Sequence, residues 1–306
     1  MFKNTPILFT GGSGLLATNW AQAIREHCVP TLGLHDRNIS LAQTFAKKID
    51  LESVDKLMRI LEELNCQVVV NTAGLSSVEQ CESEPALAHH VNVTLASNVA
   101  KACANLSIKL VHISTDHLFS GKDPMVTEDN SIAPVNVYGK TKAEAEYRVS
   151  KINPEALVIR TNFYGWGTSY RQSFSDMVIR GLRLHQEITL FQDVSYTPIL
   201  IDNVAKIVHD LIDLEVSGIF HVVGDDRISK YEFGLRIAEK FGLDSSKIVP
   251  GFLANQSRLT QRPFDMSLSN SKVRNLLGRP AGSIQEQIAT LHQQECNGLA
   301  QELQKL

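Results

Sequence analysis

The sequence predicts an α/β fold, with a doubly wound parallel sheet and a smaller C-terminal α/β lobe. Three observations support this prediction. Short runs rich in Val, Ile and Leu recur along the chain, segments of helical composition separate them, and a glycine-rich loop follows the first run. Such continuous apolar runs are typical of strands buried on both faces of a parallel sheet. A chain of 306 residues with 43% hydrophobic residues can bury this core without a disulfide or a structural metal.

The apolar runs and the segments between them give the order of the elements. Strands are predicted at residues 7–10, 30–35, 67–71, 109–114, 156–160 and 218–223. Helices are predicted from apolar residues at helical spacing at residues 19–27, 41–48, 54–64, 86–104 and 141–149. Strands that alternate with helices in this way predict helices on both faces of one sheet.

The alternation loosens from about residue 163, where polar and aromatic residues become more frequent. Residues 1–162 are expected to form the larger domain. Residues 163–189 and 225–306, with predicted helices at 175–184 and 230–241, are expected to form the smaller lobe. A helix at 202–214 and the strand after it indicate that residues 190–224 return to the first sheet.

Composition excludes several classes of protein. The net charge of -3 and the isoelectric point near 6.4 give no basic field of the kind that nucleic-acid binding requires. The strand predicted at residue 7 leaves no room for a signal peptide, and no apolar run approaches the roughly 20 residues that span a bilayer. Neither a nucleic acid nor a membrane is therefore expected as a partner.

The cysteines give no sign of a metal or redox site. They are scattered and lack C-x-x-C spacing, so we interpret them as buried thiols in the cytoplasm. They are Cys28, Cys66, Cys81, Cys103 and Cys296.

The first predicted strand runs directly into the loop TGGSGLLA at residues 10–17. Gly11 permits a tight turn, Gly14 lets the backbone approach a pyrophosphate, and the next helix presents free N–H groups at its N-terminus. This order of elements predicts a Rossmann dinucleotide site. The loop residues expected to contact the cofactor are Gly11, Ser13, Gly14, Leu15 and Leu16.

The end of the second strand decides which nicotinamide cofactor binds. Asp36 at this position would accept a hydrogen bond from the ribose 2′-hydroxyl of NAD(H), whereas Arg37 would pair with the 2′-phosphate of NADP(H). Both residues are present. We expect NADP(H) ahead of NAD(H), with both open.

Tyr138 and Lys142 are spaced i, i+4, so on a helix they share one face. A nearby ammonium is expected to lower the pKa of a tyrosine hydroxyl, which would assist proton exchange with an alkoxide. Thr115, or alternatively Ser114, would polarise the carbonyl. Tyr147 and Lys151 repeat the spacing on the opposite face of the same helix. We choose Tyr138 and Lys142 because they begin the helix, at the carboxyl edge of the sheet.

Several motifs together resemble the dTDP-4-dehydrorhamnose reductase family of the extended short-chain dehydrogenase/reductases. They are STDHLFSG at residues 114–121, Glu128-Asp129, PVNVYGKTK at 134–142, Asn71 to Gly74, Val91 to Val93, Arg160-Thr161, Asp193 to Pro198 and Arg262-Pro263. The resemblance covers nearly the whole chain. It implies NAD(P)H-dependent reduction of the C4 keto group of a dTDP-linked 6-deoxyhexulose, and a homodimer is common in the family.

The resemblance also assigns site residues. Asp50 and Leu51, after the second helix, would lie near the adenine. The cofactor cleft would be lined by Asn71, Thr72, Ala73, Gly74 and Asn92. The smaller lobe would bind the substrate, which would be contacted by Ser114, His117, Asn162 and Arg262. We interpret His117 as a packing or substrate-contact residue rather than a proton donor.

The sequence departs from the family where the sugar is expected. His117 replaces a tyrosine, Met125 an aromatic residue, and Ser173 an asparagine, while Val194 and Tyr196 replace Gln and Gly. The exact sugar is therefore left open.

Two other functions are open at this stage. One is a nucleotide-sugar epimerase or dehydratase, although Asp116-His117 stands where the dehydratases often have Asp-Glu. The other is a non-catalytic NADP-binding subunit, because the regulatory subunit of methionine adenosyltransferase resembles the same reductases.

Overall fold

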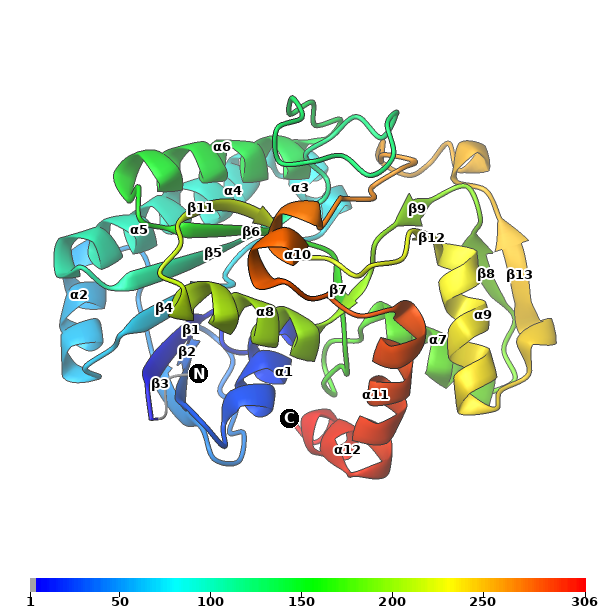
Figure 1. Ribbon diagram of the computed structural model, residues 1–306, viewed down its shortest axis with the longest axis horizontal. Helices are drawn as coiled ribbons and strands as arrows, with labels where there is room; N and C mark the ends of the chain where they lie inside the picture. The colour runs from blue at the N-terminus through cyan, green and yellow to red at the C-terminus, as the bar shows by residue number, and fades with distance from the viewer. Residues whose placement is uncertain (1–3) are drawn as a thin grey trace.

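The computed structural model describes residues 4–306. Its centre is a seven-stranded parallel sheet of order β11-β6-β5-β4-β1-β2-β3 (Figure 1). The strands are β1 (Pro6–Thr10), β2 (Val29–Leu34), β3 (Phe45–Lys48), β4 (Val68–Asn71), β5 (Lys109–Thr115), β6 (Leu157–Thr161) and β11 (Gly218–His221). The prediction of a doubly wound parallel sheet is confirmed.

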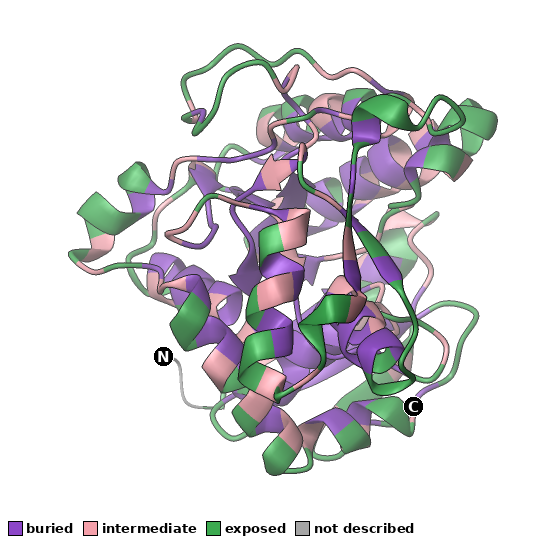
Figure 2. Cartoon of the chain, turned by 90° about the vertical axis from the view of Figure 1, so that its right-hand side faces the viewer, coloured by how far each residue is buried: buried purple, intermediate pink, exposed green. Residues whose placement is uncertain are grey.

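Helices cover both faces of this sheet. One face packs against α2 (Val54–Glu63), α5 (Leu95–Leu106) and α6 (Val137–Ile152), and the other against α1 (Leu15–Ile24) and α8 (Ile201–Asp213). Side chains alternate between the two layers along each strand, so Leu8 of β1 joins the first layer while Ile7 and Phe9 join the second. The central strands are buried, the edge strand β3 is mostly exposed, and the outward faces of the helices are exposed (Figure 2).

The predicted helix at residues 41–48 is wrong. Residues Phe45–Lys48 form β3, which pairs in parallel with β2 at the edge of the sheet. The apolar spacing of Leu41 and Phe45 imitates a helix, but Phe45 is 63% exposed and only Leu41 is buried. Pairing satisfies backbone groups along the edge of β2 that a helix would leave without partners. Asp50 and Leu51 therefore follow a strand rather than a helix.

The predicted helix at residues 86–104 is one helical run with an internal change of geometry. It consists of α4 (Pro85–His89), a π turn (His90–Thr94) and α5. The preceding helix is α3 (Val78–Ser83).

Most segments after β6, with the exception of α8 and β11, build a smaller lobe beside the sheet, on the right in Figure 1. Its strands pair two by two, β7 (Phe163–Tyr164) with β10 (Ile199–Leu200), β9 (Ser195–Tyr196) with β12 (Ile228–Ser229), and β8 (Ile188–Phe191) with β13 (Ile248–Gly251). Its helices are α7 (Phe174–Arg183), α9 (Lys230–Phe241) and α11 (Ile284–Cys296), with short 3-10 turns at Ser245–Lys247 and Leu253–Asn255. Of the other two helices, α10 (Ser271–Leu277) packs against β11 and α12 (Leu299–Gln304) against α11.

Three further expectations can be compared with the fold. In the described part of the chain, no helix has the length and apolarity needed to cross a membrane. Residues 4–306 also contain no group of three or more His, Cys, Asp or Glu side chains able to hold a metal ion. The prediction of buried cysteines is correct for Cys28, Cys66, Cys81 and Cys103 but wrong for Cys296, which is exposed on α11.

Candidate active site

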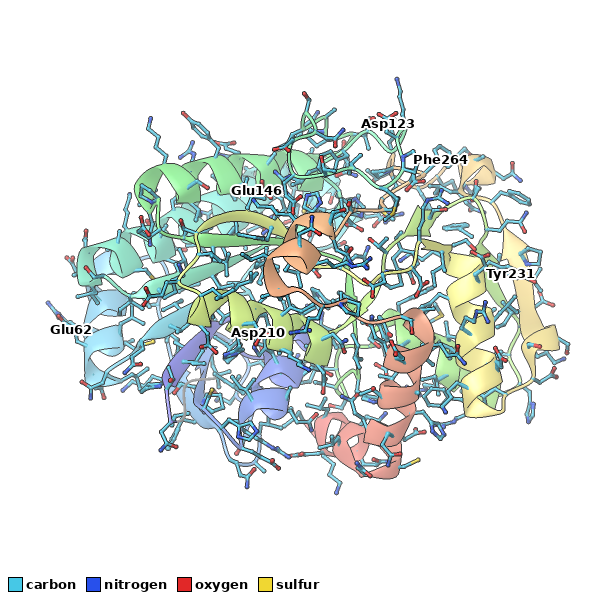
Figure 3. The ribbon with its side chains drawn as sticks, in the orientation of Figure 1. Glu62, Asp123, Glu146, Asp210, Tyr231 and Phe264 are labelled. Atoms are coloured by element: carbon cyan, nitrogen blue, oxygen red, sulfur yellow. The ribbon has the colours of Figure 1, made fainter. Side chains whose placement is uncertain are left out.

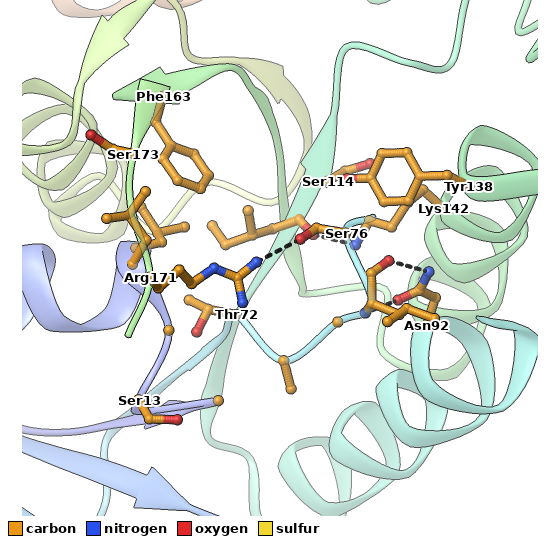
Figure 4. Close-up of a pocket in the computed structure, with 18 of the residues that line it drawn as sticks. Ser13, Thr72, Ser76, Asn92, Ser114, Tyr138, Lys142, Phe163, Arg171 and Ser173 are labelled. Carbon is orange, nitrogen blue, oxygen red and sulfur yellow. Dashed lines mark hydrogen bonds between the residues drawn. The ribbon is translucent and has the colours of Figure 1, made fainter. Parts of the chain in front are cut away.

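A cavity of about 640 Å³, the first cavity, lies at the carboxyl ends of β1, β4 and β5, where the sheet meets the smaller lobe (Figure 4). Open α/β sheets bind ligands at this edge. Of the residues predicted from the sequence, those that line it are Gly11, Ser13, Gly14, Leu15, Leu16, Arg37, Thr72, Ala73, Gly74, Asn92, Ser114, Tyr138 and Lys142.

The glycine loop has the backbone that a pyrophosphate site needs. Gly11 has a φ of +63°, and a Cβ atom there would lie 2.9 Å from Cα of Ala73, so only glycine fits between the two loops. No side chain caps the N-terminus of α1, where Gly14 is the N-cap residue. The first amide groups of α1 are left for an anion, so these residues fit a dinucleotide.

Arg37 and Asp36 have different surroundings. Arg37 lines the first cavity and its guanidinium lies 4.0 Å from the ring centroid of Tyr170, whose hydroxyl donates to the Ser13 carbonyl at 2.8 Å. The Asp36 carboxylate points away into solvent, 90% exposed and paired with His35. The structure brings only the arginine to the cofactor cavity.

Three other predicted cofactor residues do not line this cavity. Asn71 is buried beneath it, accepting a hydrogen bond from Thr10 at 2.6 Å. Asp50 accepts from Lys56 at 3.0 Å on the surface, and Leu51 packs against the core between α2 and α5. Asn92, in the π turn, does line the cavity and donates to Thr141 at 3.0 Å.

Tyr138 lies in the first turn of α6, which the Asn136 side chain caps by accepting from the Gly139 amide at 2.8 Å. Lys142 follows one turn later on the same buried face. Tyr147 is 66% exposed, so the second Tyr-x-x-x-Lys pair faces solvent.

The electrostatics of this pair differ from the expectation. Burial raises the pKa of Tyr138 to about 12, while a hydrogen bond with Thr115 acts in the opposite direction. Lys142 is not among the causes of this shift, and its ammonium donates to the Ile113 carbonyl at 2.6 Å. Burial lowers the pKa of Lys142 itself to about 8. Tyr138 is therefore held as a neutral phenol, the form that can donate a proton.

The end of β5 and the start of the lobe share a buried polar network. Thr115 Oγ1 donates to Asp116 Oδ1 at 3.2 Å, and Asn162 donates to the other oxygen of the same carboxylate. Ser114 Oγ lines the first cavity, and no described residue forms a hydrogen bond with it. Thr115 contacts the phenol and Ser114 faces the cavity, so both hydroxyls stay candidates for polarising a carbonyl.

A second cavity of about 460 Å³ adjoins the first, and Phe174 lines both. Three of the four predicted substrate residues, His117, Asn162 and Arg262, line the second cavity. The His117 ring contacts the Tyr138 ring edge to face, with centroids 5.5 Å apart. Burial lowers the pKa of His117, so its ring is neutral at pH 7. The arrangement places the Tyr138 phenol in the first cavity and in contact with a residue that lines the second.

Sequence reasoning missed three residues that the lobe brings to the site. Tyr170 and Arg171 cover the first cavity, where the Arg171 guanidinium donates to Ser76 Oγ at 2.9 Å (Figure 4). Lys230 lines the second cavity. None belongs to a motif that the sequence analysis used. The tyrosine-arginine pair in a loop rich in polar and aromatic residues was the available signal.

Comparisons with known proteins agree with this geometry. A family model described as RmlD substrate binding domain matches residues 5–296. A probable low-salt glycan biosynthesis reductase, Agl14, of Haloferax volcanii is 31% identical, over 92% of this chain and 95% of that protein. The methionine adenosyltransferase 2 subunit beta of Mus musculus is 27% identical, over 88% of this chain and 82% of that protein.

Solved structures share the whole architecture. A dTDP-4-dehydrorhamnose reductase from Clostridium acetobutylicum has a TM-score of 0.81 at 26% identity, covering 95% of this chain and 99% of that one. Another from Bacillus anthracis, in complex with NADP, has a TM-score of 0.81 at 23% identity, covering 96% of this chain and 100% of that one. The chain therefore belongs to the RmlD substrate binding domain family, as a Rossmann-fold oxidoreductase related to dTDP-4-dehydrorhamnose reductases.

Proposed function

We propose that this protein reduces the C4 keto group of a nucleotide-linked 6-deoxyhexulose, with dTDP as the nucleotide and NADPH as the favoured reductant. One observation carries the proposal: Tyr138, a buried neutral phenol, lines the first cavity beside His117, which lines the second. A hydride donor in one cavity and a ketone in the other would meet at this hydroxyl.

The residues then have separate tasks. NADPH, when bound, would supply the hydride. Tyr138 would donate its proton to the forming alkoxide, and Thr115, bonded to both Tyr138 and Asp116, would hold that hydroxyl in position, while Ser114, whose Oγ has no partner among the described residues, would donate to the ketone oxygen. Lys142, held by the Ile113 carbonyl, would keep a positive charge near the tyrosine and bind the nicotinamide ribose. The smaller lobe of residues 163–189 and 225–306 would supply the substrate contacts of Arg262 and bury the sugar.

NADPH is favoured over NADH because of the surroundings of Arg37. Its guanidinium lines the first cavity, where it could pair with a 2′-phosphate, whereas the Asp36 carboxylate faces solvent. The related Bacillus anthracis reductase was solved with NADP. We propose NADH as the alternative reductant and the cytoplasm as the place of the reaction.

The binding-subunit function is supported by the relation to methionine adenosyltransferase 2 subunit beta. The complete set of Thr115, Tyr138 and Lys142 around the cavity favours an enzyme. The epimerase or dehydratase function needs an additional acid or base at the keto carbon, and His117, beside Tyr138, is held neutral by burial.

The test is oxidation of NADPH by purified protein with dTDP-4-keto-6-deoxyhexoses, with NADH in parallel and the product identified by NMR. Stoichiometric formation of a C4 alcohol supports the proposal. Tight NADPH binding without turnover of any keto-sugar would contradict it and favour the binding-subunit function. Conversion without net NADPH loss would favour an epimerase or dehydratase.

A further inference from the structure

Lys230 is a cation in the second cavity to which no role has yet been assigned. It is the first residue of α9, next to the N-cap residue Ser229, and its amide donates to the Val194 carbonyl at 3.0 Å. Its side chain lines the second cavity with His117 and Asn162. In Figure 3 the neighbouring Tyr231 marks this end of α9, in the lobe beside the sheet. The backbone contact and the helix cap fix the base of the side chain.

Aromatic rings hold the ammonium of Lys230 without satisfying its hydrogens. Nζ lies 3.5 Å from the ring centroid of Tyr196 and 4.8 Å from that of Phe174. The Tyr196 ring is itself 2% exposed and packs against Phe233, so it cannot move aside easily. A ring face attracts a cation, but an ammonium has three N–H donors. No described residue accepts a hydrogen bond from Nζ, so these donors are available to a ligand in the cavity.

The charges around Lys230 do not provide the missing acceptor. Asp116 is the carboxylate that favours the charged form of Lys230, but its two oxygens already accept from Thr115 and Asn162. Arg262 disfavours the charged form, and its own guanidinium pairs with Glu79 at 2.6 Å. Burial lowers the pKa of Lys230 to about 8, which leaves it charged at neutral pH.

The place of Lys230 indicates which part of a substrate it meets. His117 lines the second cavity together with Lys230, and its ring contacts the ring of Tyr138, with centroids 5.5 Å apart. Lys230 therefore faces the region around the reacting carbon. In a 4-keto-6-deoxyhexose the two carbons next to C4 are C3, which carries a hydroxyl, and C5, which carries the methyl group. C5 also bears the ring oxygen, but this ether oxygen is a weaker acceptor than a hydroxyl, so the C3 hydroxyl is the better acceptor beside the reacting carbon.

We propose that Lys230 is a specificity-determining residue that donates a charge-assisted hydrogen bond to the C3 hydroxyl of the keto-sugar. The proposal rests on the proposed function, because it assigns the second cavity to the sugar. Lys230 would thereby select 4-keto-sugars that have a hydroxyl at C3 over their 3-deoxy counterparts.

The test measures binding without turnover, by calorimetry with a dTDP-4-keto-6-deoxyhexose and protein saturated with oxidised NADP⁺. Lys230→Met should weaken sugar binding roughly 10- to 100-fold, as for other hydrogen bonds from charged groups. Lys230→Gln, which keeps a donor, should lose less. Lys240→Met, on the exposed face of the same helix, is the matched control and should bind as the wild type does. NADP⁺ affinity should be unchanged in all three variants.

Two further measurements distinguish this role from a structural one. A 3-deoxy analogue should bind the wild type more weakly but should bind Lys230→Met as well as the parent sugar does. Wild-type affinity for the parent sugar should fall as the pH rises above 8, and the fall should be smaller in Lys230→Met, where only Lys142, whose pKa is also about 8, still loses its charge. Equal sugar affinity in Lys230→Met and wild type, or an equal effect of 3-deoxygenation in both, would overturn the proposal. A wild type that binds but never reduces the sugar would instead count against the proposed function alone.

Discussion

Arg37 and Asp36 are neighbours in the sequence, yet only Arg37 lines the first cavity. If its guanidinium binds a 2′-phosphate, Arg37→Ala should raise the KM for NADPH roughly 10- to 100-fold and leave the KM for NADH almost unchanged. Steady-state kinetics with both cofactors measure this. Asp36→Ala is the control, and it should change neither KM by more than about two-fold, since the Asp36 carboxylate faces solvent. A large rise in the KM for NADH in Asp36→Ala would show that the Asp36 carboxylate, and not Arg37, contacts the adenosine ribose.

The site residues that could be predicted from the sequence are those in local motifs. Gly11, Tyr138 and Lys142 have fixed spacing within one strand, loop or helix, so their neighbours in the chain identify them. Lys230 and Arg171 reach the cavities through the path of the smaller lobe. No short-range pattern encodes that path, which is why sequence reasoning missed them.

At the scale of elements, the turn from β1 to α1 depends on close contact with the loop after β4. Gly11→Ala should sharply weaken NADPH binding, because a Cβ atom 2.9 Å from Ala73 would push these two loops apart. Its positive φ adds strain of about 1–2 kcal/mol. Calorimetric titration with NADPH measures the loss of affinity, and urea unfolding measures the loss of stability caused by the strain.

Gly278→Ala is the matched control for this substitution. Gly278 has a φ of +64°, close to that of Gly11, but a Cβ atom there meets nothing within 4 Å. Gly278→Ala should lower the free energy of unfolding through the same backbone strain, but its affinity for NADPH should equal that of the wild type. NADPH affinity that survives in Gly11→Ala would mean that the loops tolerate separation.

The error at β3 has a physical cause at the same scale. An exposed edge strand has no buried face to impose strict alternation, and its four residues Phe45–Lys48 have the composition of an amphipathic helix. The pairing with β2 decides that these residues form a strand. β2 lies close to β3 in both space and sequence, but the spacing of apolar residues does not reveal the pairing. The central strands were predictable because burial on both faces makes their composition apolar throughout.

At the scale of the whole molecule, buried neutral histidines make stability depend on pH. Burial lowers the pKa of His209 to about 4 and that of His221 to about 3. An unfolded histidine has a pKa near 6.5, so between about pH 4 and 6.5 the unfolded chain binds protons that the folded chain excludes. The free energy of unfolding should therefore fall as the pH is lowered through this range, by a few kcal/mol for each histidine.

His209→Gln tests this at the interface of α1 and α8, where Trp20 Nε1 donates to His209 Nε2 at 3.2 Å. A glutamine oxygen can accept the same hydrogen bond but does not titrate. Urea unfolding at pH 5 and pH 7.5 should give a smaller difference in the variant than in the wild type. An unchanged difference would show that His209 contributes nothing to the acid sensitivity.

Fold and family could be predicted from the sequence because the glycine loop, the buried strands and the Tyr-x-x-x-Lys motif occur in one consistent order. The sugar could not, because the second cavity is assembled from parts that lie far apart in the sequence: the segments after β5 and β6, α7, β8, α9 and the Arg262 loop.

The most direct test of the central claim is the single-turnover rate of NADPH oxidation with a dTDP-4-keto-6-deoxyhexose in Tyr138→Phe and in Tyr147→Phe. Tyr138→Phe should lower the rate by roughly 10²- to 10⁴-fold while NADPH affinity is retained. Tyr147→Phe, which changes the exposed tyrosine of the same helix, should react at the wild-type rate. A Tyr138→Phe protein that reacts as fast as Tyr147→Phe would contradict the assignment of Tyr138 as the proton donor.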